Sequence, residues 1–179
     1  MTAGVLSSTL VLFYLSSGYS LFMYTPQWLS FYNRLIGGVG GAWRAGFEAT
    51  YYWDALDDEA LRWLSDHASP GGKVFLATYP KANLRRLRAW RPIDWEIASA
   101  PEQADWYVVQ NRPSGWSEID RRLFFEGRAS FEKRIRRLGP ASPVLLKVFS
   151  RREYLRLSRA ATQFGSGGAA ASFNGSRPH

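Results

Sequence analysis

Five carboxylates lie close together in the first third of the chain and could supply acid–base chemistry: Glu48, Asp54, Asp57, Asp58 and Glu59. Paired carboxylates in a cleft can act as a general acid and a general base. The last three also stand where apolar residues of helical spacing begin, and negative charge stabilises the N-terminus of a helix. The simpler interpretation of these three is therefore a helix start, with Asp57 or Asp58 as the cap.

Other signatures of catalysis are absent from the sequence. The chain has no Cys and two His residues, His67 and His179, so no pair stands at metal-ligand spacing. No phosphate-binding loop, dinucleotide fingerprint or nucleophile elbow is present. Tyr51, Tyr52 and Trp53 fit either a sugar-stacking platform or packing at a membrane surface. We predict no catalytic residue, no metal and no cofactor in this chain.

Lys and Arg residues give the chain a net charge of +8 and fall mainly into two clusters. Such clusters can be solvated faces or, beside a membrane, contacts with anionic lipid. The cations that we assign to lipid or phosphate contact are Arg85, Arg86, Arg88, Arg134, Arg136 and Arg137. A nucleic-acid partner is not expected, because no recognition motif accompanies the charge.

An apolar run from Ala3 to Tyr24 precedes all of these residues, and the first charged side chain is that of Arg34. A helix of about 20 apolar residues crosses the hydrocarbon core of a bilayer. A cleaved signal peptide would have a positively charged start and a shorter apolar stretch, so the run predicts one transmembrane helix. Several hydroxyl groups in it favour contact with neighbouring helices, where hydroxyls find partners: Ser7, Ser8, Thr9, Ser16, Ser17 and Ser20.

Composition divides the chain into four segments. These are a transmembrane helix at 1–25, an aromatic and Gly-rich juxtamembrane segment at 26–55, an α/β extramembrane domain at 56–158 and a disordered tail at 159–179. The glycines between Gly37 and Gly46 fit either a flexible loop or a tight turn packed against the membrane-facing surface.

The extramembrane domain shows alternating helical and strand patterns. Helices are expected from the Asp57 region to the breaker at 69–72, over 81–90, from a Ser117 cap to Gly127, and over 151–159; strands are expected over 73–78, 94–98, 105–110, 129–138 and 143–149. The link between the last two strands is short, so these two should be antiparallel. The predicted fold is α/β, with one N-terminal transmembrane helix followed by a small α/β sandwich that has a mixed sheet.

The juxtamembrane segment carries the most specific pattern, WLSFYNRLIGG at 28–38 followed by FEATYYW at 47–53. This pattern resembles the segment after the last transmembrane helix of bacterial GT-C type membrane glycosyltransferases, similar to the dolichyl-phosphate-mannose protein mannosyltransferase family. A weaker likeness continues through DWYVVQNR at 105–112 to the closing strand. The matching motif residues are Tyr32, Asn33, Gly37, Gly38, Tyr52 and Trp53, and Asp54 stands where the family usually has Gly.

The resemblance implies an integral protein of the bacterial plasma membrane that transfers a hexose from a polyprenyl-phosphate donor. The family's catalytic acidic residues lie in the first extracytoplasmic loop, far upstream of the matching segment, so none is carried over to this chain. The implied partners are the lipid bilayer, the polyprenyl-phosphate-sugar and the remaining transmembrane part of a transferase. The six motif residues would seat the domain against the bilayer.

The side of the membrane is predicted differently by two arguments. Arg34 and Arg44 follow the span and no Lys or Arg precedes it, which favours a cytoplasmic domain. The resemblance places the domain on the extracytoplasmic side, which we adopt because earlier helices of a transferase would set the orientation. Two functions follow: a C-terminal fragment or subunit of such a transferase, inactive alone, or a single-span module that binds anionic lipid, an envelope polymer or a partner membrane protein.

Overall fold

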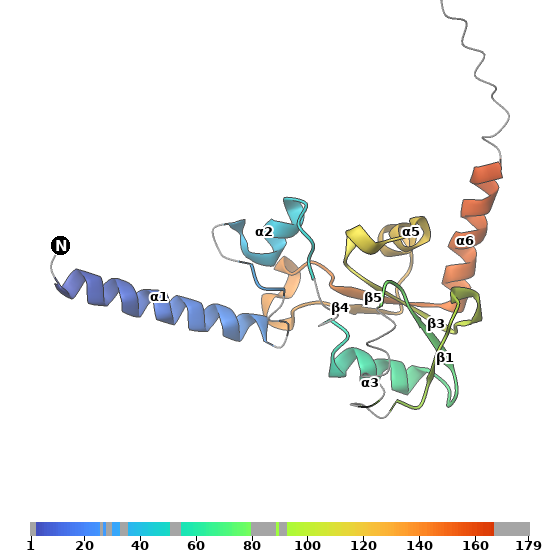
Figure 1. Ribbon diagram of the computed structural model, residues 1–179, viewed down its shortest axis with the longest axis horizontal. Helices are drawn as coiled ribbons and strands as arrows, with labels where there is room; N and C mark the ends of the chain where they lie inside the picture. Colours follow the sequence, from blue (N-terminus) through green and yellow to red (C-terminus); the bar gives the residue numbers. More distant parts are fainter. Residues whose placement is uncertain are drawn as a thin grey trace, which may run out of the picture.

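A long helix projects from an α/β domain built on a five-stranded sheet in the computed structural model (Figure 1). The structure describes residues 3–25, 27, 30–32, 36–50, 55–79, 89 and 93–166. The predicted fold class is confirmed, because one apolar N-terminal helix precedes an α/β domain with a mixed sheet. Nearly all of the predicted helix over 81–90 lies outside the described residues, as does the part of the predicted tail at 167–179.

Helix α1 (Ala3–Tyr24) carries apolar side chains on all sides and leaves them exposed. Its 22 residues span roughly 33 Å at about 1.5 Å per residue. Within the described part of the chain it is the one helix long and apolar enough to cross a membrane. Leu12, near its middle, is 67% exposed. A helix that is apolar all round needs lipid or other helices to cover it.

The hydroxyl groups of α1 are partly satisfied by the helix itself. Thr9 donates a hydrogen bond to the carbonyl of Val5, and Ser20 donates one to the carbonyl of Ser16. These two hydroxyls therefore do not require the neighbouring helices that the sequence pattern favoured.

The sheet has the strand order β2-β1-β3-β5-β4. Its strands are β1 (Lys73–Leu76), β2 (Glu96–Ile97), β3 (Trp106–Gln110), β4 (Phe131–Lys133) and β5 (Leu146–Ser150). Strand β1 is parallel to β2 and β3, whereas β5 is antiparallel to β3 and β4. The predicted antiparallel pairing of the last two strands is confirmed.

The prediction of one strand over 129–138 was wrong in extent. The strand ends at Lys133 and is followed by a 3-10 turn, η5 (Arg136–Ala141). Past Lys133 the backbone N–H of Ile135 donates to the Ser142 hydroxyl at 3.0 Å, and that of Leu138 donates to the Ile135 carbonyl, so neither can continue the ladder. Pro143 has no N–H for a ladder bond, and β5 starts only at Leu146.

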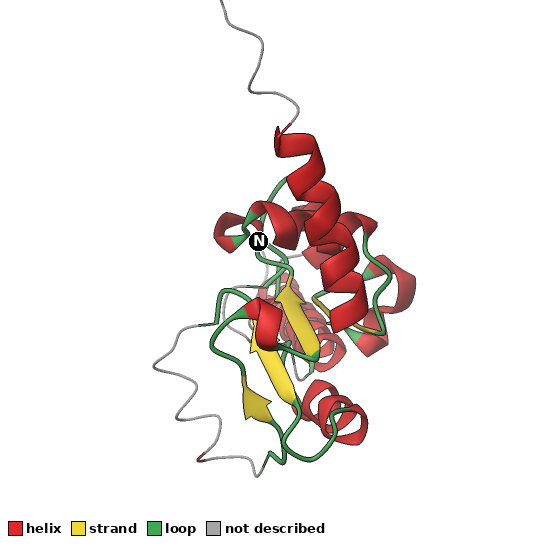
Figure 2. Cartoon of the chain, turned by 90° about the vertical axis from the view of Figure 1, so that its right-hand side faces the viewer, coloured by secondary structure: helices red, strands yellow, loops and turns green. Residues whose placement is uncertain are grey.

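Helices cover both faces of the sheet (Figures 1 and 2). Helix α3 (Asp58–His67) packs on one face, over buried strand residues such as Val74 and Val148. Helices α5 (Glu118–Glu126) and α6 (Arg151–Ser166) pack on the other face, over Tyr107 and Phe149. Short elements complete the chain: α2 (Gly38–Arg44), η3 (Pro101–Gln103) and η4 (Pro113–Gly115).

The predicted helix boundaries hold at α3 and α5 but not at α6. Asp57 accepts hydrogen bonds from the backbone N–H groups of residues 59 and 60, at 3.1 and 3.2 Å, and Ser117 forms a capping box with Asp120. Helix α6 continues to Ser166, beyond the predicted helix over 151–159, so residues 160–166 of the predicted disordered tail are helical. Two alanines at 160 and 161 favour this continuation, because Ala has the highest helix propensity.

Candidate functional site: the pocket at the base of α1

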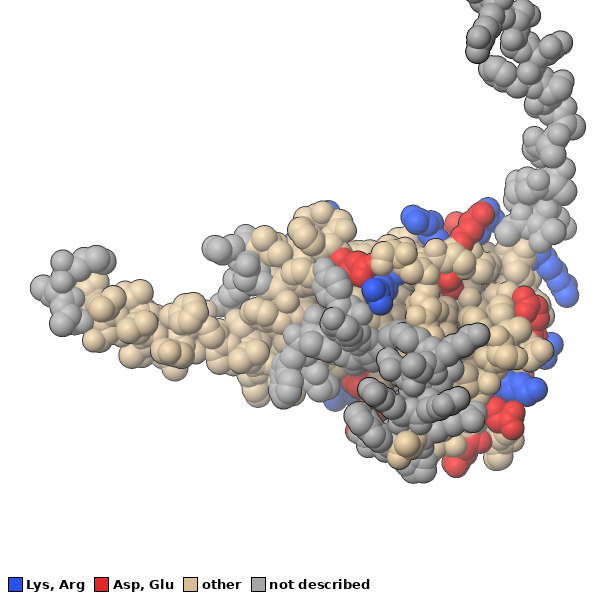
Figure 3. Space-filling model, viewed as in Figure 1, with Lys and Arg blue, Asp and Glu red and all other residues tan. Residues whose placement is uncertain are grey.

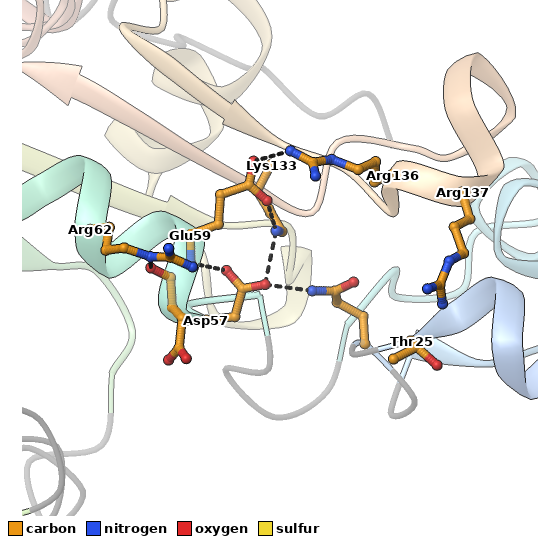
Figure 4. Close-up of a pocket in the computed structure, with 9 residues that line it drawn as sticks. Thr25, Asp57, Glu59, Arg62, Lys133, Arg136 and Arg137 are labelled. Carbon is orange, nitrogen blue, oxygen red and sulfur yellow. Dashed lines mark hydrogen bonds and ion pairs between the residues drawn. The ribbon is translucent and has the colours of Figure 1, made fainter.

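A pocket of about 500 Å³ lies where α1 meets the domain (Figure 4). Its walls come from the end of α1, the start of α3, strand β4 and turn η5, which are far apart in the sequence. The lining residues are Thr25, Gln27, Asp57, Asp58, Glu59, Arg62, Lys133, Arg136 and Arg137. Four cations thus face three carboxylates, and the surface of α1 next to them carries no charge (Figure 3).

A buried ion cluster closes the floor of this pocket. The Lys133 side chain is 5% exposed, and its Nζ lies 2.8 Å from Asp57 Oδ2 and in contact with Glu59 Oε2. Strand β4 places Lys133 opposite Leu146 in the sheet. A buried ammonium is tolerated when carboxylates pair with it, because their attraction offsets the cost of desolvation. Sequence spacing could not reveal this cluster, since Lys133 is 74 residues from Glu59.

The ion cluster favours the structural interpretation of Asp57 and Glu59 over the catalytic one. Asp57 uses one carboxylate oxygen to cap α3 and the other to pair with Lys133. Glu59 contacts Lys133 and lies 3.7 Å from Arg136. Both carboxylates are therefore engaged in holding α3 against β4 and η5. Asp54, the remaining uncertain member of the acidic set, lies outside the described residues.

Gln27 joins α1 to this cluster. It is 0% exposed, and its Nε2 donates a 2.7 Å hydrogen bond to Asp57 Oδ2. Its carbonyl oxygen Oε1 is buried and has no hydrogen-bond partner within the described structure. A buried amide oxygen without a partner carries a desolvation cost of about 1–3 kcal/mol. Gln27 was not among the predicted site residues, and its position directly after an apolar helix was the one signal in the sequence.

Arg137 holds the last turn of α1 from outside. Its guanidinium donates a hydrogen bond to the carbonyl of Phe22 and lies 3.8 Å from the centre of the Phe22 ring. The last carbonyls of a helix have no partner within the helix, and a cation there also matches the helix dipole. Arg136, its neighbour in η5, is 87% exposed beside the same pocket.

Tyr24, at the end of α1, packs on the glycine-rich turn at residues 37–41, and we call this contact the joint. Gly37 and Gly38 have φ angles of +81° and +63°, which favour glycine over other residues. The Tyr24 hydroxyl accepts a 2.8 Å hydrogen bond from the backbone of Val39. A Cβ on Gly38 would lie 2.8 Å from that hydroxyl, and one on Gly41 would lie 1.7 Å from the Ile36 carbonyl oxygen. The segment is therefore a tight turn and short helix, which agrees with the tight turn of the two alternatives, and it packs on Tyr24 of α1.

Two stretches that carry the family resemblance meet beside this joint. Glu48, from the first stretch, accepts a 3.0 Å hydrogen bond from the Ser114 backbone and pairs with Arg112 at 3.3 Å. Gln110 donates a hydrogen bond to Thr50. The FEATYYW and DWYVVQNR stretches are thus in direct contact although 60 residues apart.

The structure brings together only part of the predicted site. Tyr32, whose hydroxyl donates a 2.6 Å hydrogen bond to the Glu48 carbonyl, lies at the joint with Gly37 and Gly38. Arg136 and Arg137 line the pocket, but Arg134 instead donates to the Ser142 carbonyl at 2.8 Å. The predicted residues that lie outside the described residues are Asn33, Tyr52, Trp53, Arg85, Arg86 and Arg88, together with Tyr51 of the aromatic trio.

Comparison with protein-family models, with curated proteins and with solved structures finds no match to this chain. In the described part of the chain, no group of three His, Asp or Glu side chains is placed to hold a metal ion. The features of the described structure that bear on function are the joint, the pocket and the apolar helix.

Proposed function

We propose that this chain is the last transmembrane helix and extracytoplasmic domain of a bacterial membrane glycosyltransferase that uses a polyprenyl-phosphate-sugar. Its role in that enzyme is to seat the domain at the bilayer surface, while the catalytic acids lie in the remaining part of the transferase. The observation that carries the proposal is the joint. Of the residues that match the family motif, Gly38 lies directly against Tyr24 at the end of α1, Gly37 has the positive φ of the same turn, and Tyr32 is hydrogen-bonded to Glu48.

The exposed surface of α1 supports the same proposal. A helix with almost none of its surface covered by its own domain needs a bilayer or partner helices around it. The neighbouring helices of a multi-span transferase would supply part of that cover, and lipid the remainder.

The test is the size of the native polypeptide in host membranes. An antibody raised against residues 57–149 should detect a band several times larger than 20.3 kDa, or a 20 kDa chain that co-purifies with a multi-span transferase. A band near 20 kDa with no transferase in the complex would contradict the proposal.

A second function is favoured by the cations at the base of α1. Arg136 is exposed and Arg137 contacts Phe22, so both lie at the end of the candidate span. A single-span module could use them to bind anionic lipid, with roughly 1 kcal/mol for each cation close to the surface. Such attraction weakens with salt, so lipid binding that is unchanged between low and high ionic strength would contradict this alternative.

A further inference from the structure

The pocket at the base of α1 contains one buried polar atom that pairs with no described residue. The Gln27 carbonyl oxygen is buried without a partner within the described structure, on a side chain whose nitrogen is fixed by Asp57. Because the oxygen and nitrogen of an amide point in different directions, this oxygen faces away from Asp57. It can accept a hydrogen bond from a hydroxyl or an ammonium group of a ligand.

Cations face the same space from η5. Arg137 uses one guanidinium nitrogen for the Phe22 carbonyl, and a guanidinium has five N–H donors. Arg136 has one ion pair, at 3.7 Å from Glu59, and is otherwise exposed. Figure 4 shows Arg136 and Arg137 on the η5 side of the pocket, with Thr25 of the α1 end near Arg137. Guanidinium groups bind phosphate oxygens well, because their planar fork can donate two parallel hydrogen bonds.

The contact between Arg137 and Phe22 shows at which level of the candidate membrane span the pocket lies. Phe22 belongs to the last turn of α1, so the pocket lies level with the end of the candidate span. With α1 in a bilayer, as the proposed function requires, this is the level of the lipid phosphates. A soluble phosphate compound would reach the pocket less readily than a headgroup that is already there.

We propose that the pocket binds a lipid headgroup in which a phosphate carries a hydrogen-bond-donating substituent, either hydroxyl or ammonium. Arg136 and Arg137 hold the phosphate, and the Gln27 carbonyl oxygen accepts the hydrogen bond from the substituent. Asp58 also lines the pocket and adds negative charge to it. The volume of about 500 Å³ lies within the usual range of small-ligand sites.

The test uses the full chain in detergent and short-chain phospholipids as probes, with binding followed by native mass spectrometry. Phosphatidylglycerol and phosphatidylethanolamine carry donors on the substituent, whereas phosphatidylcholine does not. At least one donor lipid should bind about fivefold or more tighter than phosphatidylcholine, the size of one well-formed hydrogen bond. Equal binding of all three lipids would overturn the proposal. Inorganic phosphate that binds as tightly as the donor lipids would overturn the lipid assignment.

Two variants separate the parts of the site. Gln27→Met removes the carbonyl oxygen and should abolish the preference for donor lipids, with weak phosphatidylcholine binding retained. Arg136→Gln should weaken every phospholipid about fivefold or more, because a charge-assisted contact to phosphate is lost. Arg152→Gln on α6 makes the same charge change outside the pocket and should leave binding unchanged.

If Gln27→Met disrupts the joint, Arg136→Gln still tests the proposal. Arg136 is exposed, so its substitution leaves the fold intact, and unchanged lipid binding in Arg136→Gln would overturn the proposal on its own. The result is independent of the polypeptide size in host membranes. A 20 kDa chain that still selects donor lipids would reject the transferase proposal and retain this site.

Discussion

Both faces of the sheet pack aromatic rings, but among the described residues the buried cation, Lys133, lies on the α3 face alone. The face under α5 and α6 is closed by aromatic pairs: the ring centres of Tyr107 and Tyr154 are stacked 4.8 Å apart, and those of Trp116 and Phe124 lie 4.8 Å apart in a tilted arrangement. The α3 face continues into the joint with α1 and contains the paired charges of Lys133 and its carboxylates. The first face has the character of a stable core, and the second places charges at the end of the candidate membrane helix.

Two tyrosines on the α5/α6 face, Tyr107 and Tyr154, have raised pKa values. Burial is the main reason that the pKa of Tyr107 is raised far above its usual value, and burial also raises the pKa of Tyr154 to about 12. Both phenols therefore keep their protons across physiological pH, and Tyr107 donates a 2.8 Å hydrogen bond to Asp120. The α5/α6 face contributes stability, whereas the α3 face is the side on which we expect ligand-dependent behaviour.

The largest loss of stability is expected on the α5/α6 face. Phe149 is fully buried, so Phe149→Ala should lower the free energy of unfolding by about 3–5 kcal/mol through lost burial and a cavity. Urea titration of the full chain in detergent, followed by Trp fluorescence, measures this change. Phe125→Ala is the matched control, because Phe125 is 62% exposed and should cost less than about 1 kcal/mol. Equal losses in the two variants would contradict the assignment of the core.

The ion cluster on the α3 face should give the next largest effect. Lys133→Met leaves Asp57 and Glu59 without their shared cation. The free energy of unfolding should fall by about 2–3 kcal/mol, which is less than the loss expected for a fully buried ion pair, because Glu59 is half-exposed. Adding Asp57→Asn, which keeps the cap of α3, should restore part of this loss. The same urea titration measures both variants. A double variant that is less stable than Lys133→Met alone would show that the charge cluster is not what holds α3 to β4.

The joint should tolerate no side chain at Gly41. In Gly41→Ala the new Cβ would meet the Ile36 carbonyl oxygen, and relief of this clash should cost about 1–3 kcal/mol. Limited proteolysis should then cut between α1 and the domain faster than in the original chain. Gly18→Ala in α1 is the control, because nothing lies within 4 Å of a Cβ there. Unchanged proteolysis of Gly41→Ala would contradict the tight joint.

The smallest predicted effect is a pH dependence at the start of α6. The hydrogen bond from Arg156 is the main cause that lowers the pKa of Glu153 from 4.5 to about 2, with help from the Arg128 backbone. A carboxyl group with a lowered pKa stabilises the fold above its unfolded pKa, and this contribution is lost as pH falls from about 4.5 toward about 2. In Glu153→Gln the stability should therefore fall less over this interval. Urea midpoints measured near pH 7 and near pH 3 test this, and an identical decrease in both proteins would contradict it.

Sequence signals predicted those features that depend on residues close together in the chain. The Ser117 and Asp57 caps, the strand over β3 and the apolar helix each depend on a few neighbouring residues, and all were predicted from them. The strand over β4 ends sooner than its alternating pattern suggested, because the Ile135 backbone N–H donates to the Ser142 hydroxyl, a residue distant from it in that pattern.

The pocket could not be predicted because its members come from four distant segments. Lys133 and Arg137 belong to the same basic cluster in the sequence. Only the fold shows that Lys133 is buried with carboxylates and that Arg137 contacts α1. For Gln27 the sequence offered only its position directly after the apolar helix, which does not indicate the contact with Asp57. Contacts between distant segments depend on strand order and register, which composition does not encode.

The most direct test of the account is the depth of α1 and η5 in a bilayer. The chain has no Cys, so single Cys residues can carry spin labels at Leu12, Arg136 and Arg121 of the reconstituted protein. Power saturation with oxygen and with a water-soluble nickel complex reports the depth of each label. We predict that Leu12 lies in the hydrocarbon, Arg136 at the headgroup level and Arg121 in water. A Leu12 label that is as accessible to the nickel complex as the Arg121 label would contradict the membrane seating of this protein.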